Sequence, residues 1–149
     1  MEFKDVLISI TGSQEYGDDF TDSVELITSG QYSFNGGEST LTYMESELTG
    51  LEGTQTSFTV EPFGVTMLRE GTLNSRMVFE EGRKHYFLYE TPFGSSTMGV
   101  DTQRINMQLT ESGGDMEIDY AIDFDNSFVG KNKFIIKVFE QKDGAVWQI

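Results

Sequence analysis

Apolar and polar residues alternate with a period of two along most of this chain. The alternation is clearest in three late segments (105–109, 118–124 and 134–138), where apolar residues occupy every second position. Successive side chains of a β-strand point to opposite faces, so each segment has one apolar and one mostly polar face. This pattern is typical of antiparallel sheets that cover a core with one face.

Shorter segments earlier in the chain repeat the pattern. The positions expected to share apolar faces are Val6, Ile8 and Ile10; Val24, Leu26, Tyr32 and Phe34; Leu41 and Tyr43; Phe58 and Val60; Val65 and Met67; and Met77 and Phe79. Residues 84–91 carry aromatic side chains on both faces, so their orientation stays open. The apolar parity changes between Val100 and Ile105, which predicts a bulge or turn near residues 101–104.

Short segments rich in glycine, proline and asparagine separate these strands. The predicted turns lie at 35–37, 62–64, 70–71, 81–82, 92–94, 113–114 and 125–126, and an acidic loop is predicted at 15–22. They would join roughly nine to eleven strands into successive hairpins. We therefore predict one all-β domain over residues 1–149, an antiparallel up-and-down β-barrel, with a two-layer β-sandwich as the alternative. Short connections favour the barrel, because closure removes exposed strand edges.

Three segments carry a resemblance to a known family: Glu45–Thr56 (ESELTGLEGTQT), Gly71–Phe79 (GTLNSRMVF) and Tyr89–Gly94 (YETPFG). With them, the chain resembles the uncharacterised bacterial YwiB family over essentially its whole length. The resemblance implies a calycin-like barrel, related in shape to lipocalins, of unassigned function, and it implies no catalytic residues. The chain lacks the Gly-x-Trp of true lipocalins near its first strand, and its single tryptophan is Trp147.

Composition narrows the partners. With 25 acidic and 10 basic residues the net charge is −15, which repels nucleic-acid phosphates and anionic membranes, so neither is expected as a partner. The absence of cysteine and the single histidine argue against disulfides and structural zinc, and no metal or cofactor is expected. No secretory signal or long apolar run is seen, so we expect a cytoplasmic protein, monomeric or homodimeric.

The inward positions of the predicted barrel change from apolar to polar toward one end. On the strand predicted at 38–47, for example, Leu41 and Tyr43 are followed at the same parity by Glu45 and Glu47. The residues predicted at this mouth are Tyr43, Glu45, Glu47, Thr54, Thr56, Arg69, Ser75 and Tyr89. Arg76 has outward parity and is added for its place in the YwiB-like segment. Glu47 and Arg69 could simply pair in a hydrated barrel end.

We predict a non-enzymatic protein that binds a small ligand at this mouth, with Arg69 or Arg76 meeting an anionic group through a bidentate hydrogen bond. One alternative is an acidic interaction or structural module that docks a basic partner. Another is a hydrolase that uses Glu45 and Glu47. His85 is expected to stack among neighbouring aromatic residues of its strand, since no nucleophile motif accompanies it. The methionines are expected mainly to fill gaps in the core.

Overall fold

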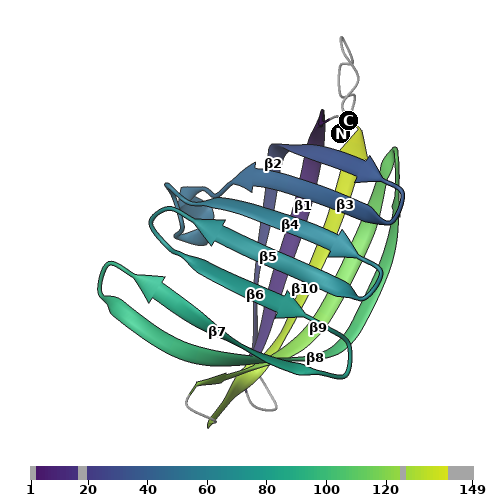
Figure 1. The fold of residues 1–149 in the computed structure, drawn as a ribbon. Helices are drawn as coiled ribbons and strands as arrows, with labels where there is room; N and C mark the ends of the chain where they lie inside the picture. Colours follow the sequence, from purple (N-terminus) through teal and green to yellow (C-terminus); the bar gives the residue numbers. More distant parts are fainter. Residues whose placement is uncertain (1–2, 17–19, 125–126, 141–149) are drawn as a thin grey trace.

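The computed structural model describes residues 3–16, 20–124 and 127–140 of the 149-residue chain. Within these residues it contains ten β-strands and one short 3-10 helix (Figure 1). Their bounds are β1 (Lys4–Tyr16), β2 (Phe20–Asn35), β3 (Glu38–Met44), η1 (Glu47–Thr49), β4 (Gln55–Glu61), β5 (Gly64–Glu70), β6 (Ser75–Phe79), β7 (Lys84–Thr91), β8 (Gly94–Thr110), β9 (Gly113–Phe124) and β10 (Ser127–Glu140).

The strands form one antiparallel sheet in the order β6-β5-β4-β3-β2-β1-β10-β9-β8-β7. All sequence neighbours pair except β6 and β7, and the first and last strands pair with each other. The ends of this order meet at one bridge, where the backbone amides of Asn74 and Glu90 each donate to the other's carbonyl oxygen (2.9 and 3.0 Å). The sheet is thus a nearly closed up-and-down barrel, which confirms the predicted fold and not the sandwich alternative.

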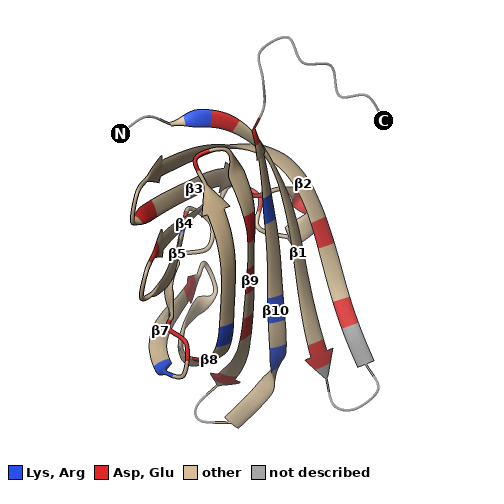
Figure 2. Cartoon of the chain, turned by 90° about the vertical axis from the view of Figure 1, so that its right-hand side faces the viewer, with Lys and Arg blue, Asp and Glu red and all other residues tan. Residues whose placement is uncertain are grey.

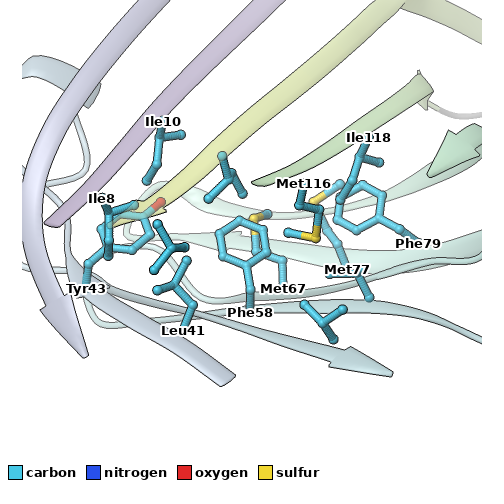
Figure 3. Close-up of a cluster of buried hydrophobic side chains, with 14 of the residues drawn as sticks. Ile8, Ile10, Leu41, Tyr43, Phe58, Met67, Met77, Phe79, Met116 and Ile118 are labelled. Carbon is cyan, nitrogen blue, oxygen red and sulfur yellow. The ribbon is translucent and has the colours of Figure 1, made fainter. Parts of the chain in front are cut away.

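The barrel interior is filled by the faces that the alternation predicts (Figure 3). Phe58, Met67 and Phe79 are fully buried, and Phe134 of β10 packs edge-on against Phe58 and Phe79 with ring centroids 6.1 and 6.4 Å apart. Two residues of the predicted apolar faces are not buried: Val24, near the start of β2, is 44% exposed, and Phe124, at the end of β9, is 43% exposed. The middle of the barrel is therefore a packed core.

The strand whose orientation the pattern left open faces inward with its odd-numbered residues, since Phe87 is buried while Tyr86 and Leu88 are exposed. The predicted change of parity is confirmed as a register shift between Thr102 and Arg104. Met67, Met77 and Met116 fill the core as expected, whereas Met44 is exposed.

Two expectations are corrected. The acidic loop predicted at 15–22 is shorter, because β1 continues to Tyr16 and β2 begins at Phe20. His85 was expected to stack on its neighbours, but its Nε2 lies 3.0 Å from Glu80 Oε1. The turn predicted at 125–126, residues 17–19 and Trp147 lie outside the described residues. In the described part of the chain, no helix has the length and apolar character needed to cross a membrane.

Two glycines on the barrel wall differ in the space around them. A Cβ atom at Gly30 would lie 2.5 Å from the Thr42 carbonyl oxygen and in collision with Ile8, whereas at Gly12 the nearest atom would be Phe134 Cε1, 3.7 Å away. We expect Gly30→Ala to lower the free energy of unfolding by about 1–3 kcal/mol, measured by urea unfolding, because it overpacks the wall. Gly12→Ala is the matched control and should be neutral or slightly stabilising. Equal losses in the two variants would contradict this account.

Candidate functional site

A cavity of about 240 Å³ lies between the end of β1, the start of β2 and the loop that carries η1. Its lining residues are Ile10, Gly12, Ser13, Gln14, Asp22, Val24, Leu26, Tyr43, Glu45, Thr49, Leu51, Arg69, Tyr120, Asn132, Lys133 and Phe134. The wall from β1, β2 and β10 combines apolar side chains, such as Ile10, Leu26 and Phe134, with polar ones, such as Gln14 and Asn132. The facing wall, from β3, η1 and β5, carries the charged side chains of Glu45 and Arg69.

Glu45 is held rigidly just beyond the end of β3. Its backbone amide donates to the Thr54 carbonyl oxygen (2.9 Å), and its side chain is only 1% exposed. Its two carboxylate oxygens accept hydrogen bonds from Thr56 Oγ1 (2.5 Å) and Thr49 Oγ1 (3.1 Å). Thr49 reaches this position because η1 is capped by Ser46 at its start and by Gly50, with φ of 74°, at its end. The carboxylate is therefore a fixed, hydrogen-bonded buried anion.

Arg69 of β5 is the unsatisfied group of the site. Its Nε lies 3.8 Å from Glu45 Oε2, which is an ion pair but too long for a hydrogen bond. The Nε of this guanidinium is buried and has no hydrogen-bond acceptor among the described residues. A guanidinium carries five donors, and buried donors without partners are rare in proteins. With a side chain 17% exposed, Arg69 can offer these donors to a molecule in the cavity.

Two buried tyrosines adjoin this pair. Burial, and secondarily the negative charge of Glu45, raises the pKa of Tyr43, while Arg69 opposes the shift. Burial also raises the pKa of Tyr120, against a smaller lowering by Arg69. Both phenols therefore stay neutral at physiological pH. The Tyr120 ring stacks on Phe134 with centroids 5.5 Å apart, so it belongs to the apolar wall as well.

Comparison with known proteins now places the chain in a family. The model of the DUF1934 family, described as a domain of unknown function, matches residues 8–136. The chain belongs to the DUF1934 family. The crystal structure of the ywiB protein from Bacillus subtilis is similar, with a TM-score of 0.82 and 20% sequence identity over 94% of each chain. This confirms the resemblance to the YwiB family and the barrel fold. A comparison with curated proteins gave no match.

In this DUF1934 domain, four of the predicted mouth residues come together. Tyr43, Glu45 and Arg69 line the cavity, and Thr56 holds the Glu45 carboxylate from behind. The expected partner of Arg69 was wrong, because Arg69 pairs with Glu45 instead of Glu47. β3 ends at Met44, so Glu47 does not continue its inward face but lies exposed on η1.

The other predicted residues do not line the cavity. Thr54 is buried, and its Oγ1 accepts a hydrogen bond from the Leu73 amide (3.2 Å). Ser75, the first residue of β6, is buried. Tyr89 of β7 is partly buried and packs against the hydrophobic core of the barrel. Arg76 is exposed, as its outward parity predicted. The polar end of the barrel is thus narrower than the alternation suggested, and it is centred on Arg69.

Sequence reasoning missed the opposite wall of the cavity. Four residues of this wall, Ile10, Leu26, Tyr120 and Phe134, come from β1, β2, β9 and β10, outside the strands of the predicted mouth. Their inward parity was correctly read from the sequence. Their distance from Arg69 depends on the pairing of β1 with β10, for which the sequence has no local signal.

A second hollow, of about 580 Å³, lies on the outer face of the sheet and includes Glu15, Lys131 and Lys133. On this side acidic residues lie along β9 and basic residues lie along the neighbouring β10 (Figure 2). Lys133 Nζ lies 3.0 Å from Glu117 and 3.6 Å from Asp119. These charges already compensate one another, so this hollow is a weaker candidate than the cavity.

The buried tyrosines predict a loss of stability in alkali. Above pH 10.0, the ordinary pKa of tyrosine, the unfolded chain releases phenol protons that Tyr43 and Tyr120 retain in the folded state. The unfolded state then binds fewer protons, so the free energy of unfolding falls as pH rises through this range. In urea unfolding at about pH 9 and 11, Tyr43→Phe should show a smaller loss than the wild type. The control is Tyr86→Phe, which removes an exposed hydroxyl and should lose as much stability as the wild type. If Tyr43→Phe lost as much stability as the wild type between the two pH values, the buried Tyr43 phenol would not be a source of the loss.

The fixed anion predicts a second effect on stability. Glu45→Ala removes the counter-charge of a largely buried Arg69, so the free energy of unfolding should fall by about 3–5 kcal/mol. Adding Arg69→Met should restore part of this loss, because no unpaired charge then remains. Glu47→Ala, which removes an exposed carboxylate two residues away, should change it by less than about 0.5 kcal/mol. If Arg69→Met lowered the stability of Glu45→Ala further, the pair would not be coupled in this way.

Proposed function

We propose that this DUF1934 domain is a non-enzymatic binding protein for a small molecule that carries a hydrogen-bond acceptor. The observation that carries the proposal is the guanidinium of Arg69, which lines the cavity and whose buried Nε has no hydrogen-bond acceptor among the described residues. A ligand acceptor in the cavity would satisfy it.

The lining of the cavity supports a compact, partly apolar ligand. Ligand pockets combine apolar walls with a few placed polar groups, and here Ile10, Leu26 and Phe134 face Arg69. The volume of about 240 Å³ is near the lower limit for such pockets. Below the cavity the core is closed by fully buried side chains such as Phe58 and Phe79, which leave no passage for a long chain.

The arrangement of carboxylates favours binding over hydrolysis. The hydrolase hypothesis needs Glu45 and Glu47 to share a cleft, as the two acids of glycosidases do. Glu45 lines the cavity but is held by two threonines, and Glu47 is exposed outside its lining. His85, which pairs with Glu80, is also not among the lining residues.

A second candidate is the interaction module. Phe124 and Phe128, on the two strands of the β9–β10 hairpin, are 43% and 64% exposed, and Val129 beside them is 42% exposed. Exposed apolar side chains of this kind suit a protein contact, and the charge of −15 would favour a basic partner. The ligand proposal stands first, because an unsatisfied buried cation needs an explanation that this surface does not give.

Native mass spectrometry of protein purified from its own host tests the proposal. The wild type should retain a small bound species, which Arg69→Met should lose because the donor is gone. Gly12→Leu should also lose it, because its side chain would extend into the cavity from the wall beside Phe134. Arg76→Met, which removes an equal charge from an exposed position, should retain it.

Retention of the small species in both Arg69→Met and Gly12→Leu would refute the site. A basic protein in place of a small molecule would favour the interaction module.

A further inference from the structure

The geometry of Arg69 points to the class of ligand: we propose that it is a compact monocarboxylate, with the carboxylate on Arg69 and an apolar body against Ile10, Leu26 and Phe134. This inference rests on the proposed binding function and adds the charge, number of anionic groups and shape of the ligand.

The first argument is the unused fork of donors. A planar guanidinium matches a carboxylate through two parallel hydrogen bonds, which are stronger than those to neutral acceptors. Glu45 does not fill this role, because its Oε2 is 3.8 Å from Nε and is bonded instead to Thr56 Oγ1. Glu45 therefore balances the charge of Arg69 in the empty site but leaves the fork free. A ligand carboxylate would supply the missing hydrogen bonds.

The second argument is that one positive charge faces the cavity. The other cation among the lining residues, Lys133, has its ammonium group beside Glu117 and Asp119. Glu45 and Asp22 add negative charge to the lining, in a chain with a net charge of −15. A phosphate dianion would meet repulsion without a second cation to offset it, so a single anionic charge fits better.

A cationic ligand is also disfavoured. The buried anion of the site, Glu45, is only 1% exposed, and both of its oxygens already accept hydrogen bonds. Asp22 lines the cavity but is exposed to solvent, where an ion pair contributes little. The group most able to gain a partner is Arg69, and it is a donor.

The third argument concerns the body of the ligand. The apolar part of the lining consists of aromatic rings from Tyr43, Tyr120 and Phe134 and aliphatic side chains that include Ile10 and Leu26. The next void along the interior, beyond Phe58, is only about 10 Å³. A single ring or a short branched chain can therefore be enclosed, and a long acyl chain cannot extend down the barrel.

Calorimetric titration with matched probes tests the class. Benzoate should bind at least about tenfold more tightly than benzamide, which has the same shape without the charge. Benzylamine, phenyl phosphate and dodecanoate should each bind more weakly than benzoate. Arg69→Met should abolish the preference for benzoate over benzamide, and Arg69→Lys should reduce it, because an ammonium group cannot bind bidentately. Arg76→Met should leave it unchanged.

The outcomes separate this inference from the proposed function. If benzamide, benzylamine or phenyl phosphate binds as well as benzoate and Gly12→Leu prevents it, the site stands but the carboxylate class is overturned. If benzoate binds equally to wild type, Arg69→Lys and Gly12→Leu, its binding is nonspecific and the inference fails. If neither these probes nor a neutral fragment library binds, both proposals fail. Should Arg69→Met not fold, the benzoate–benzamide comparison in wild type and Arg69→Lys still decides.

Discussion

The pairing of the first strand with the last is the constraint on which the rest of this structure depends. β1 and β10 pair from Val6 with Glu140 to Glu15 with Lys131, and this ladder turns two meanders, β1–β6 and β7–β10, into one barrel. It also brings the aromatic residues of β9 and β10 opposite β3 and β5. Without it, Arg69 and Glu45 would face solvent, and no cavity would form between the two walls.

The same ladder explains why the cavity beside Arg69 forms at its end of the barrel. Gly12 pairs with Phe134 in the β1–β10 register, so the wall beside this ring carries no side chain. Phe134 itself packs against Phe58, Phe79 and Tyr120 and closes the core beneath. The Phe134 ring therefore contacts the packed core on one side and lines the cavity on the other. The lack of a side chain at Gly12 is what leaves space above it.

The sequence predicts what is local in this fold and misses what is distant. Alternation identified the inward faces correctly, and it selected Tyr43, Glu45 and Arg69 because parity is a property of each strand by itself. The predicted inward position of Glu47 was wrong for a reason that is visible locally in the sequence. Ser46 and Gly50 are residue types that commonly begin and end a short helical turn, and they cap η1 here. Tyr120 and Phe134 could not have been placed near Arg69, because the β1–β10 pairing joins opposite ends of the chain.

The Arg69–Glu45 pair is the feature least explained by folding alone. Removing two charges from water costs free energy that their mutual attraction often fails to recover, and apolar residues of similar volume commonly do as well or better. The rest of the barrel core is closed by buried apolar side chains, among them Phe58, Phe79 and Ile118. In this position, by contrast, an arginine whose Nε has no hydrogen-bond acceptor in the described part of the chain is paired with a carboxylate that two threonines fix in place. Apolar residues could close this end of the barrel as well, whereas the proposed binding of an acceptor requires a positioned donor of this kind.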